Sequence, residues 1–121
     1  MSIAQNPTPH PMISTTDVNG ADVYDYDGAH IGDIDHLMID KKTGRIAYAV
    51  IGFGGFLGLG EEHYPVPWQS LQYDPSKGGY LVNVTKEQLE SAPPRRENWA
   101  GDRSWEEKTH THFGAPYYWM I

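Results

Sequence analysis

Residues 44–71, GRIAYAVIGFGGFLGLGEEHYPVPWQSL, decide the fold of this chain. Within them, Arg45–Ile51 carries apolar side chains on both faces and contains the Ile, Val and Tyr residues that strands favour. A strand that is apolar on both faces is buried on both, so this segment predicts a central strand. A glycine-rich loop follows it. Pro65 and Pro67 then restrict the next extended segment, His63–Val66, to the edge of a sheet.

The residues before this stretch predict a β-hairpin. Asp22–Tyr26 is typical of a strand, Asp27-Gly28 is a strong hairpin turn signal, and His30–Ile39 is the predicted return strand. Gly32 lies early in the return strand and predicts a bulge or a close approach of two backbones. Residues 1–13 contain alternating prolines without any periodicity, so we expect a flexible leader there.

The residues after the stretch complete a predicted domain at 14–93. Leu71–Asp74 and Tyr80–Val84 are two further predicted strands, joined by a turn. Thr85 and Gln88 form a capping box, which predicts a short helix at Lys86–Ser91. About six short strands with frequent turns indicate an all-β fold, a small barrel or a sandwich.

Residues 94–121 form a charged extension that is rich in aromatic side chains. It holds three of the four tryptophans, together with tyrosines and a phenylalanine. Because disordered segments are poor in aromatic residues, we expect this extension to be ordered and to dock on the barrel. Ser104 and Glu107 form a second capping box and predict about one turn of helix.

Composition limits the classes of function. The net charge of −7 opposes nucleic-acid binding, because such proteins usually present a basic face. There is no cysteine, so neither a disulfide framework nor thiolate chemistry is expected. No apolar run approaches the roughly 20 residues that span a bilayer, and the first residues lack the pattern of a signal peptide. We therefore expect a cytoplasmic protein.

The aspartate-rich hairpin does not match a calcium loop. Val23 occupies the first ligand position of the loop and Ile34 the bidentate one, so these aspartates are expected to be turn and surface residues. His110 and His112 have the spacing of two metal ligands on a strand, but no third ligand is near them in sequence. Surface histidines are therefore predicted, and no metal.

The glycine-rich loop also fails the phosphate-binding templates. Leu57 stands where the dinucleotide motif needs glycine, and Glu61 stands where the other phosphate loop needs lysine. We find no set of residues that carries a recognisable reaction. The sequence therefore predicts a protein that is not an enzyme and that needs no organic cofactor.

An ordered set of residues over about Val18–Pro93 resembles the PRC-barrel domain family. The pattern is G-x-x-V-x-D, G-x-x-I-G, I-D, G-x-I and V-P-W, carried by Gly20, Val23, Asp25, Gly28, Ile31, Gly32, Ile39, Asp40, Gly44, Ile46, Val66, Pro67 and Trp68. The family is named for the cytoplasmic domain of the photosynthetic reaction-centre H subunit. It includes the C-terminal domain of the ribosome maturation factor RimM and stand-alone bacterial proteins, whose aromatic tails the extension resembles.

The resemblance implies a small, strongly bent β-barrel that serves as a non-enzymatic interaction or scaffold module. Such a module dimerises or docks on a protein partner. Two alternatives follow by analogy: an RNA- or ribosome-associated factor like RimM, and a protein of photosynthetic electron transport like the H subunit. The family offers no catalytic motif to transfer.

Surplus apolar residues in the loop and in the extension predict contact with a partner or with a second copy. A two-fold homodimer is the expected form, because closed pairing is the commonest way to bury such residues. The candidate contact residues are Phe53, Phe56, Leu57, Leu59, Tyr64, Trp68, Trp99, Trp105, Tyr117, Tyr118 and Trp119.

Overall fold

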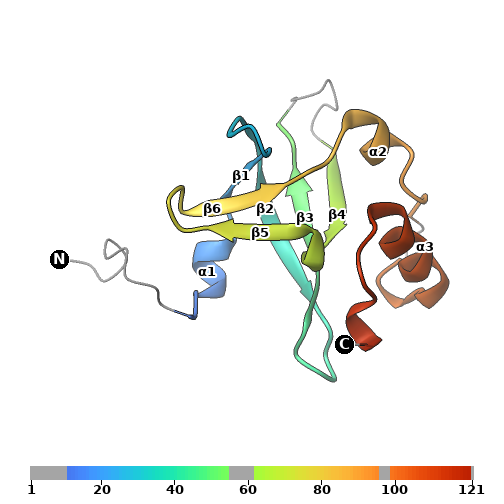
Figure 1. The fold of residues 1–121 in the computed structure, drawn as a ribbon. Helices are drawn as coiled ribbons and strands as arrows, with labels where there is room; N and C mark the ends of the chain where they lie inside the picture. The colour runs from blue at the N-terminus through green and yellow to red at the C-terminus, as the bar shows by residue number, and fades with distance from the viewer. Residues whose placement is uncertain (1–10, 55–61, 96–98, 121) are drawn as a thin grey trace.

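The computed structural model describes residues 11–54, 62–95 and 99–120, and Figure 1 shows the arrangement of the elements. Helices and strands alternate unevenly along the chain, with the strands in the first two thirds. The elements are α1 Thr15–Val18, β1 Asp22–Tyr24, β2 His30–Ile39, β3 Ile46–Gly52, β4 His63–Pro67, the 3₁₀ helix η3 Trp68–Ser70, β5 Leu71–Asp74, β6 Gly79–Val82, α2 Lys86–Glu90, η4 Trp99–Gly101, α3 Arg103–Phe113 and η5 Tyr118–Met120.

The six strands form one sheet in the order β4-β3-β2-β1-β6-β5. Neighbouring strands are antiparallel except β1 and β6, which run parallel. The sheet curls so strongly that β5 and β6 lie across the direction of β2, β3 and β4 (Figure 1). This half-barrel of six short strands confirms the predicted all-β fold.

The strand β3 is central, as its two apolar faces predict. It pairs with β2 on one side and with β4 on the other, and Ala47–Gly52 is buried throughout. The proline-containing strand β4 lies at one edge of the sheet, as predicted. A strand with neighbours on both sides satisfies its backbone groups inside the sheet, which is why it tolerates two apolar faces.

The bulge or close backbone approach predicted at Gly32 is confirmed. The pairing of β1 with β2 shifts register beside it, so that Val23 lies opposite Gly32 and Tyr24 lies opposite His30. A Cβ atom on Gly32 would overlap the backbone carbonyl oxygen of Gly52. The backbones of β2 and β3 therefore approach so closely at this bend that only glycine fits.

The main core lies inside the curl of the sheet. Trp68, in η3 between β4 and β5, and Leu71, at the start of β5, pack against this core. Its buried members come from most of the strands and from α1 and α2: Val18, Val23, Ile31, Ile34, Ala49, Ile51, Phe53, Val66, Tyr80, Val82 and Leu89.

The helices fit the sequence less well than the strands do. Thr85 caps α2 as predicted, with its side chain accepting from the Gln88 amide. The helix predicted from the second capping box is wrong in its start and its length. The helix α3 begins at Arg103, is capped by Asp102, and has 11 residues rather than a single turn. The short helix α1 was not predicted. Residues 1–10 of the expected leader lie outside the described residues.

Candidate functional site

The predicted contact residues separate into three groups in the structure. Phe53 is buried in the main core and Trp68 packs against it, so these two stabilise the barrel. Tyr64, on the edge strand β4, also packs against the main core, whereas the aromatic residues of the extension gather around Tyr48 in a second cluster: Trp99, Trp105, Tyr118 and Trp119, with Tyr117 stacked on Trp119. The remaining three, Phe56, Leu57 and Leu59, lie outside the described residues.

The extension packs on the outer face of the central strand through aromatic rings. The Tyr48 ring centroid lies 6.0 Å from that of Trp99, 5.3 Å from that of Trp105 and 6.2 Å from that of Tyr118. Together with Ala47, the buried members Tyr48, Trp105 and Tyr118 make a second apolar cluster. Burying large aromatic rings contributes about 1.5–3 kcal/mol per side chain, so this cluster fixes α3 against the sheet.

A buried carboxylate lies at the centre of this cluster. Glu106 is 5% exposed, and its Oε1 accepts hydrogen bonds from the hydroxyls of Tyr48 at 3.1 Å and Tyr118 at 2.5 Å. Arg103 Nη1 lies 3.5 Å from Oε2. Burial, followed by the effects of Glu106, raises the pKa of both tyrosine hydroxyls far above neutral. The hydroxyls therefore remain protonated donors, and the carboxylate is satisfied as a structural group.

Two arginines hold the last residues of the extension. Arg45 Nη1 donates to the Tyr118 carbonyl oxygen at 2.9 Å. The Arg103 guanidinium lies 3.8 Å from the Trp119 ring centroid. The Tyr117 ring stacks on the same tryptophan, with the two ring centroids 4.7 Å apart. The rings of Tyr117 and Trp119, predicted to contact a partner, therefore contact each other and Arg103 within the same chain.

The prediction of surface histidines is wrong for His110, and both histidines belong to the helix α3 rather than to a strand. His110 is fully buried on α3, and its Nδ1 lies 2.7 Å from the Glu106 carbonyl oxygen, which can only accept, so Nδ1 carries the proton. Burial lowers the pKa of His110 and keeps the ring neutral. His112 is half-buried, and its Nε2 lies 2.7 Å from the Gln88 carbonyl oxygen. The His110 ring thus bonds to the backbone of its own helix, and the His112 ring ties α3 to α2.

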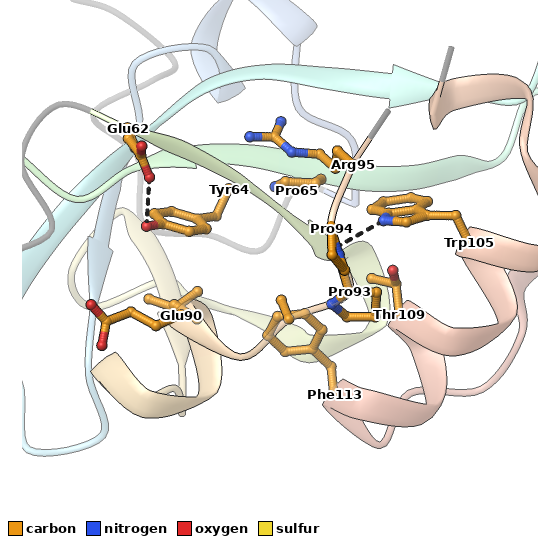
Figure 2. Close-up of a pocket in the computed structure, with 12 residues that line it drawn as sticks. Glu62, Tyr64, Pro65, Glu90, Pro93, Pro94, Arg95, Trp105, Thr109 and Phe113 are labelled. Atoms are coloured by element: carbon orange, nitrogen blue, oxygen red, sulfur yellow. Dashed lines mark hydrogen bonds between the residues drawn. The ribbon is translucent and has the colours of Figure 1, made fainter. Parts of the chain in front are cut away.

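Between β4, α2 and α3 lies an open groove of about 350 Å³ (Figure 2). β4 supplies one wall and α3 supplies the other, where Trp105, Thr109 and Phe113 are spaced four residues apart and so share one face of the helix. The segment after α2 closes the groove between these walls. The lining residues are Glu62, Tyr64, Pro65, Leu89, Glu90, Ala92, Pro93, Pro94, Arg95, Trp105, Thr109 and Phe113.

Hydrogen bonds set the shape of this groove. The Trp105 indole Nε1 donates to the Pro93 carbonyl oxygen at 3.1 Å, which ties α3 to the segment after α2. Arg95 Nη2 donates to the His63 carbonyl oxygen at 2.8 Å, which ties the same segment to the start of β4. Pro93 and Pro94 limit the backbone freedom of that segment. The groove is therefore largely pre-formed rather than made by mobile side chains.

Two of the predicted contact residues, Tyr64 and Trp105, lie in the groove. The sequence reasoning missed Glu90, Thr109 and Phe113, although the four-residue spacing from Trp105 to Phe113 could have indicated a shared helix face. A second hollow of about 390 Å³ lies beside Tyr48, Trp99 and Tyr118, next to the buried Glu106. The Glu106 carboxylate already accepts two hydrogen bonds from within the chain. The groove beside β4 is therefore the better candidate for binding.

The described residues contain no group of three or more histidine, aspartate or glutamate side chains placed to hold a metal ion. In the same ranges, no helix has the length and apolarity to cross a bilayer.

Comparisons with known proteins identify the barrel. Residues 10–89 match the model of the PRC-barrel domain, whereas no curated protein is significantly similar in sequence. Among solved structures, a similar one is a Pseudomonas aeruginosa protein described as a 16S ribosomal RNA processing protein, RimM, with 19% identity and a TM-score of 0.46. The alignment covers 66% of this chain and 48% of that one, so the chain spans about half the length of RimM. Because the domain model matches more than half of its residues, the chain belongs to the PRC-barrel domain family.

Proposed function

We propose that this protein is a non-enzymatic interaction module, a PRC-barrel that dimerises or docks on a protein partner through the groove beside β4. The observation that carries the proposal is the groove itself. It is open, lined by aromatic, proline and aliphatic side chains together with polar and charged ones, and held in shape by two hydrogen bonds to backbone carbonyls. Pre-formed grooves that combine apolar side chains with convergent polar groups are typical of binding sites.

The titratable groups near the groove support binding rather than a reaction. Burial, followed by the hydrogen bond to Glu62, raises the pKa of Tyr64, so its hydroxyl stays protonated at neutral pH and acts as a donor. No nucleophile with an adjacent base lines the groove among the described residues. The chemistry on this face is therefore that of recognition.

The experiment fills the groove with a bulky side chain and compares it with the same change elsewhere. Ala92→Tyr places a ring at the groove, whereas Ala29→Tyr places one on the exposed turn between β1 and β2. Sedimentation at micromolar concentration is expected to show a wild-type dimer that Ala92→Tyr weakens and Ala29→Tyr leaves intact.

A monomeric wild type would shift the test to a foreign partner. In that case, affinity capture from the native organism is expected to recover a protein with wild type and with Ala29→Tyr but not with Ala92→Tyr. The proposal would be overturned if the wild type is a monomer and if every captured protein is recovered equally with wild type and with Ala92→Tyr.

A further inference from the structure

We infer that the groove binds a basic segment of a protein, and that it takes one lysine or arginine side chain with the charged end beside Glu62 and Glu90. This inference rests on the proposed function, because it names the chemistry of the occupant. Three observations on the groove carry it: the charges at one end, the apolar side chains that line its middle, and an unsatisfied hydroxyl at its other end.

Two carboxylates lie at the same end of the groove. Figure 2 shows Glu62 and Glu90 on either side of Tyr64, away from Trp105 and Thr109. The Tyr64 hydroxyl donates to Glu62 Oε2 at 3.0 Å, and the charges of both glutamates raise the pKa of Tyr64. Both carboxylates are thus within electrostatic reach of one hydroxyl group.

These negative charges are only partly neutralised within the groove. Glu90 makes no hydrogen bond or ion pair with another described residue. Arg95 is the one cationic residue that lines the groove in the described ranges, and its Nη2 donates to the His63 carbonyl oxygen. Two carboxylates therefore face one arginine, whose single positive charge offsets only one of them. The net charge of −7 adds a field that attracts cations and repels an acidic segment.

The length of the groove suits the aliphatic stem of a basic side chain. Pro65, Leu89 and Phe113 line it between the acidic end and α3. Lysine and arginine bury their methylene stems against such surfaces while the charged group stays in a polar environment. The Tyr64 and Phe113 rings also attract a cation that lies over their faces.

The opposite end of the groove lacks a hydrogen-bond partner. Thr109 is 1% exposed, and its Oγ1 is buried without a partner among the described residues. Because Oγ1 is shielded from solvent, a bound segment reaches it once the side chain turns toward the groove, and the hydroxyl can then donate to or accept from a peptide group. A buried polar group that gains a partner on binding favours a peptide over a purely apolar ligand.

The test compares three blocked nonapeptides of glycine and serine whose central residue is lysine, norleucine or glutamate. Norleucine keeps the aliphatic stem of lysine without the charge. The Trp105 indole N–H and the amides of residues 89–92 report binding by NMR, because they line or flank the groove. We expect the lysine peptide to shift these signals saturably at millimolar concentration, the norleucine peptide to bind more weakly, and the glutamate peptide not to bind.

Two variants on the same helix test the role of charge. Glu90→Gln removes a carboxylate from the groove, and Glu87→Gln removes one from the exposed first turn of α2, outside the lining. Glu90→Gln is expected to weaken the lysine peptide about fivefold, the effect of one partly solvated ion pair, and Glu87→Gln to leave its affinity unchanged. Thermal melts verify that both variants fold.

Equal binding of the lysine and norleucine peptides, equal effects of the two variants, or no binding of the lysine peptide would each overturn the basic occupant. Those results leave the proposed interaction role to be decided by the Ala92→Tyr comparison, which does not depend on the charge of the occupant.

Discussion

The hydroxyl of Tyr48 donates a hydrogen bond to Glu106 Oε1 at 3.1 Å, and this bond joins residues 58 positions apart. Tyr48 lies on the central strand and Glu106 on α3, so the contact fixes the extension to the middle of the sheet. Because both residues are buried, water cannot replace this bond, and without it Glu106 Oε1 keeps only the hydrogen bond from Tyr118.

Tyr48→Phe is therefore expected to lower the free energy of unfolding by about 1–3 kcal/mol, since a buried carboxylate loses one of its donors. Tyr26→Phe, at a tyrosine that is 60% exposed, is the matched control and is expected to be neutral. Urea denaturation measures both variants. Equal stability of Tyr48→Phe and wild type would contradict a structural role for the Glu106 hydrogen bonds.

Acidification is expected to destabilise the protein through His110. Its folded-state pKa is lowered from 6.5, chiefly by burial, so below about pH 6.5 the unfolded state binds a proton more readily than the folded state. Stability is present above that pH and is lost as the pH falls toward the folded-state pKa. The lowered pKa values of Asp35, Asp40 and Asp74 act only nearer their ordinary value of 3.8, outside this window.

Thermal unfolding between pH 7.5 and pH 5 measures this effect. His110→Gln is expected to flatten the dependence of melting temperature on pH, whereas His30→Gln, at an exposed histidine, is expected to keep the wild-type slope. The slope rather than the absolute melting temperature is compared, because the substitution also changes packing. An unchanged slope in His110→Gln would show that the buried ring does not titrate in this range.

Gly32→Ala is expected to be strongly destabilising. Its methyl group would overlap the carbonyl oxygen of Gly52, and backbone atoms can move only by distorting β2 and β3. Overpacking of this kind costs about 1–3 kcal/mol. Gly101→Ala is the matched control, because a Cβ atom there meets nothing within 4 Å. Similar melting temperatures for the two variants would rule out the close approach.

Removing residues 99–121 is expected to lower the melting temperature. The truncation uncovers Tyr48 and Ala47, which are buried in the second apolar cluster, and removes their aromatic neighbours. Met120→Ser in the full chain is the control, since Met120 is 75% exposed. If the truncated chain melts like the wild type, the extension contributes nothing to the barrel.

The strands were predictable because their signals are local. The bounds of His30–Ile39 and Leu71–Asp74 follow from turn residues on each side, and both were predicted correctly. Pro65 and Pro67 likewise reveal an edge strand without knowledge of the sheet order. The parallel pairing of β1 with β6 has no such local signal, because it joins segments far apart in sequence.

The extension was harder to predict because its buried face is polar. Glu106 and His110 are buried on α3, so the apolar periodicity that marks an amphipathic helix is interrupted there. Their polar groups find partners that the helix pattern does not reveal: Glu106 accepts from Tyr48 on a distant strand and from Tyr118, and His110 Nδ1 donates to the Glu106 carbonyl oxygen. The same reasoning applies to the groove: Tyr64 and Trp105 were expected to make contacts, but Glu90 and Thr109 enter the site through the tertiary fold alone.

The two walls of the groove come from different parts of the chain, β4 of the barrel and α3 of the extension. An occupant that touches both walls binds only while α3 is in place. The coupling is reciprocal: the binding free energy that the occupant loses when α3 detaches equals the free energy that the bound occupant adds to the cost of detaching α3. Protease cleavage within residues 99–120 should then slow as the groove fills, so the extension would report occupancy of a site it helps to build.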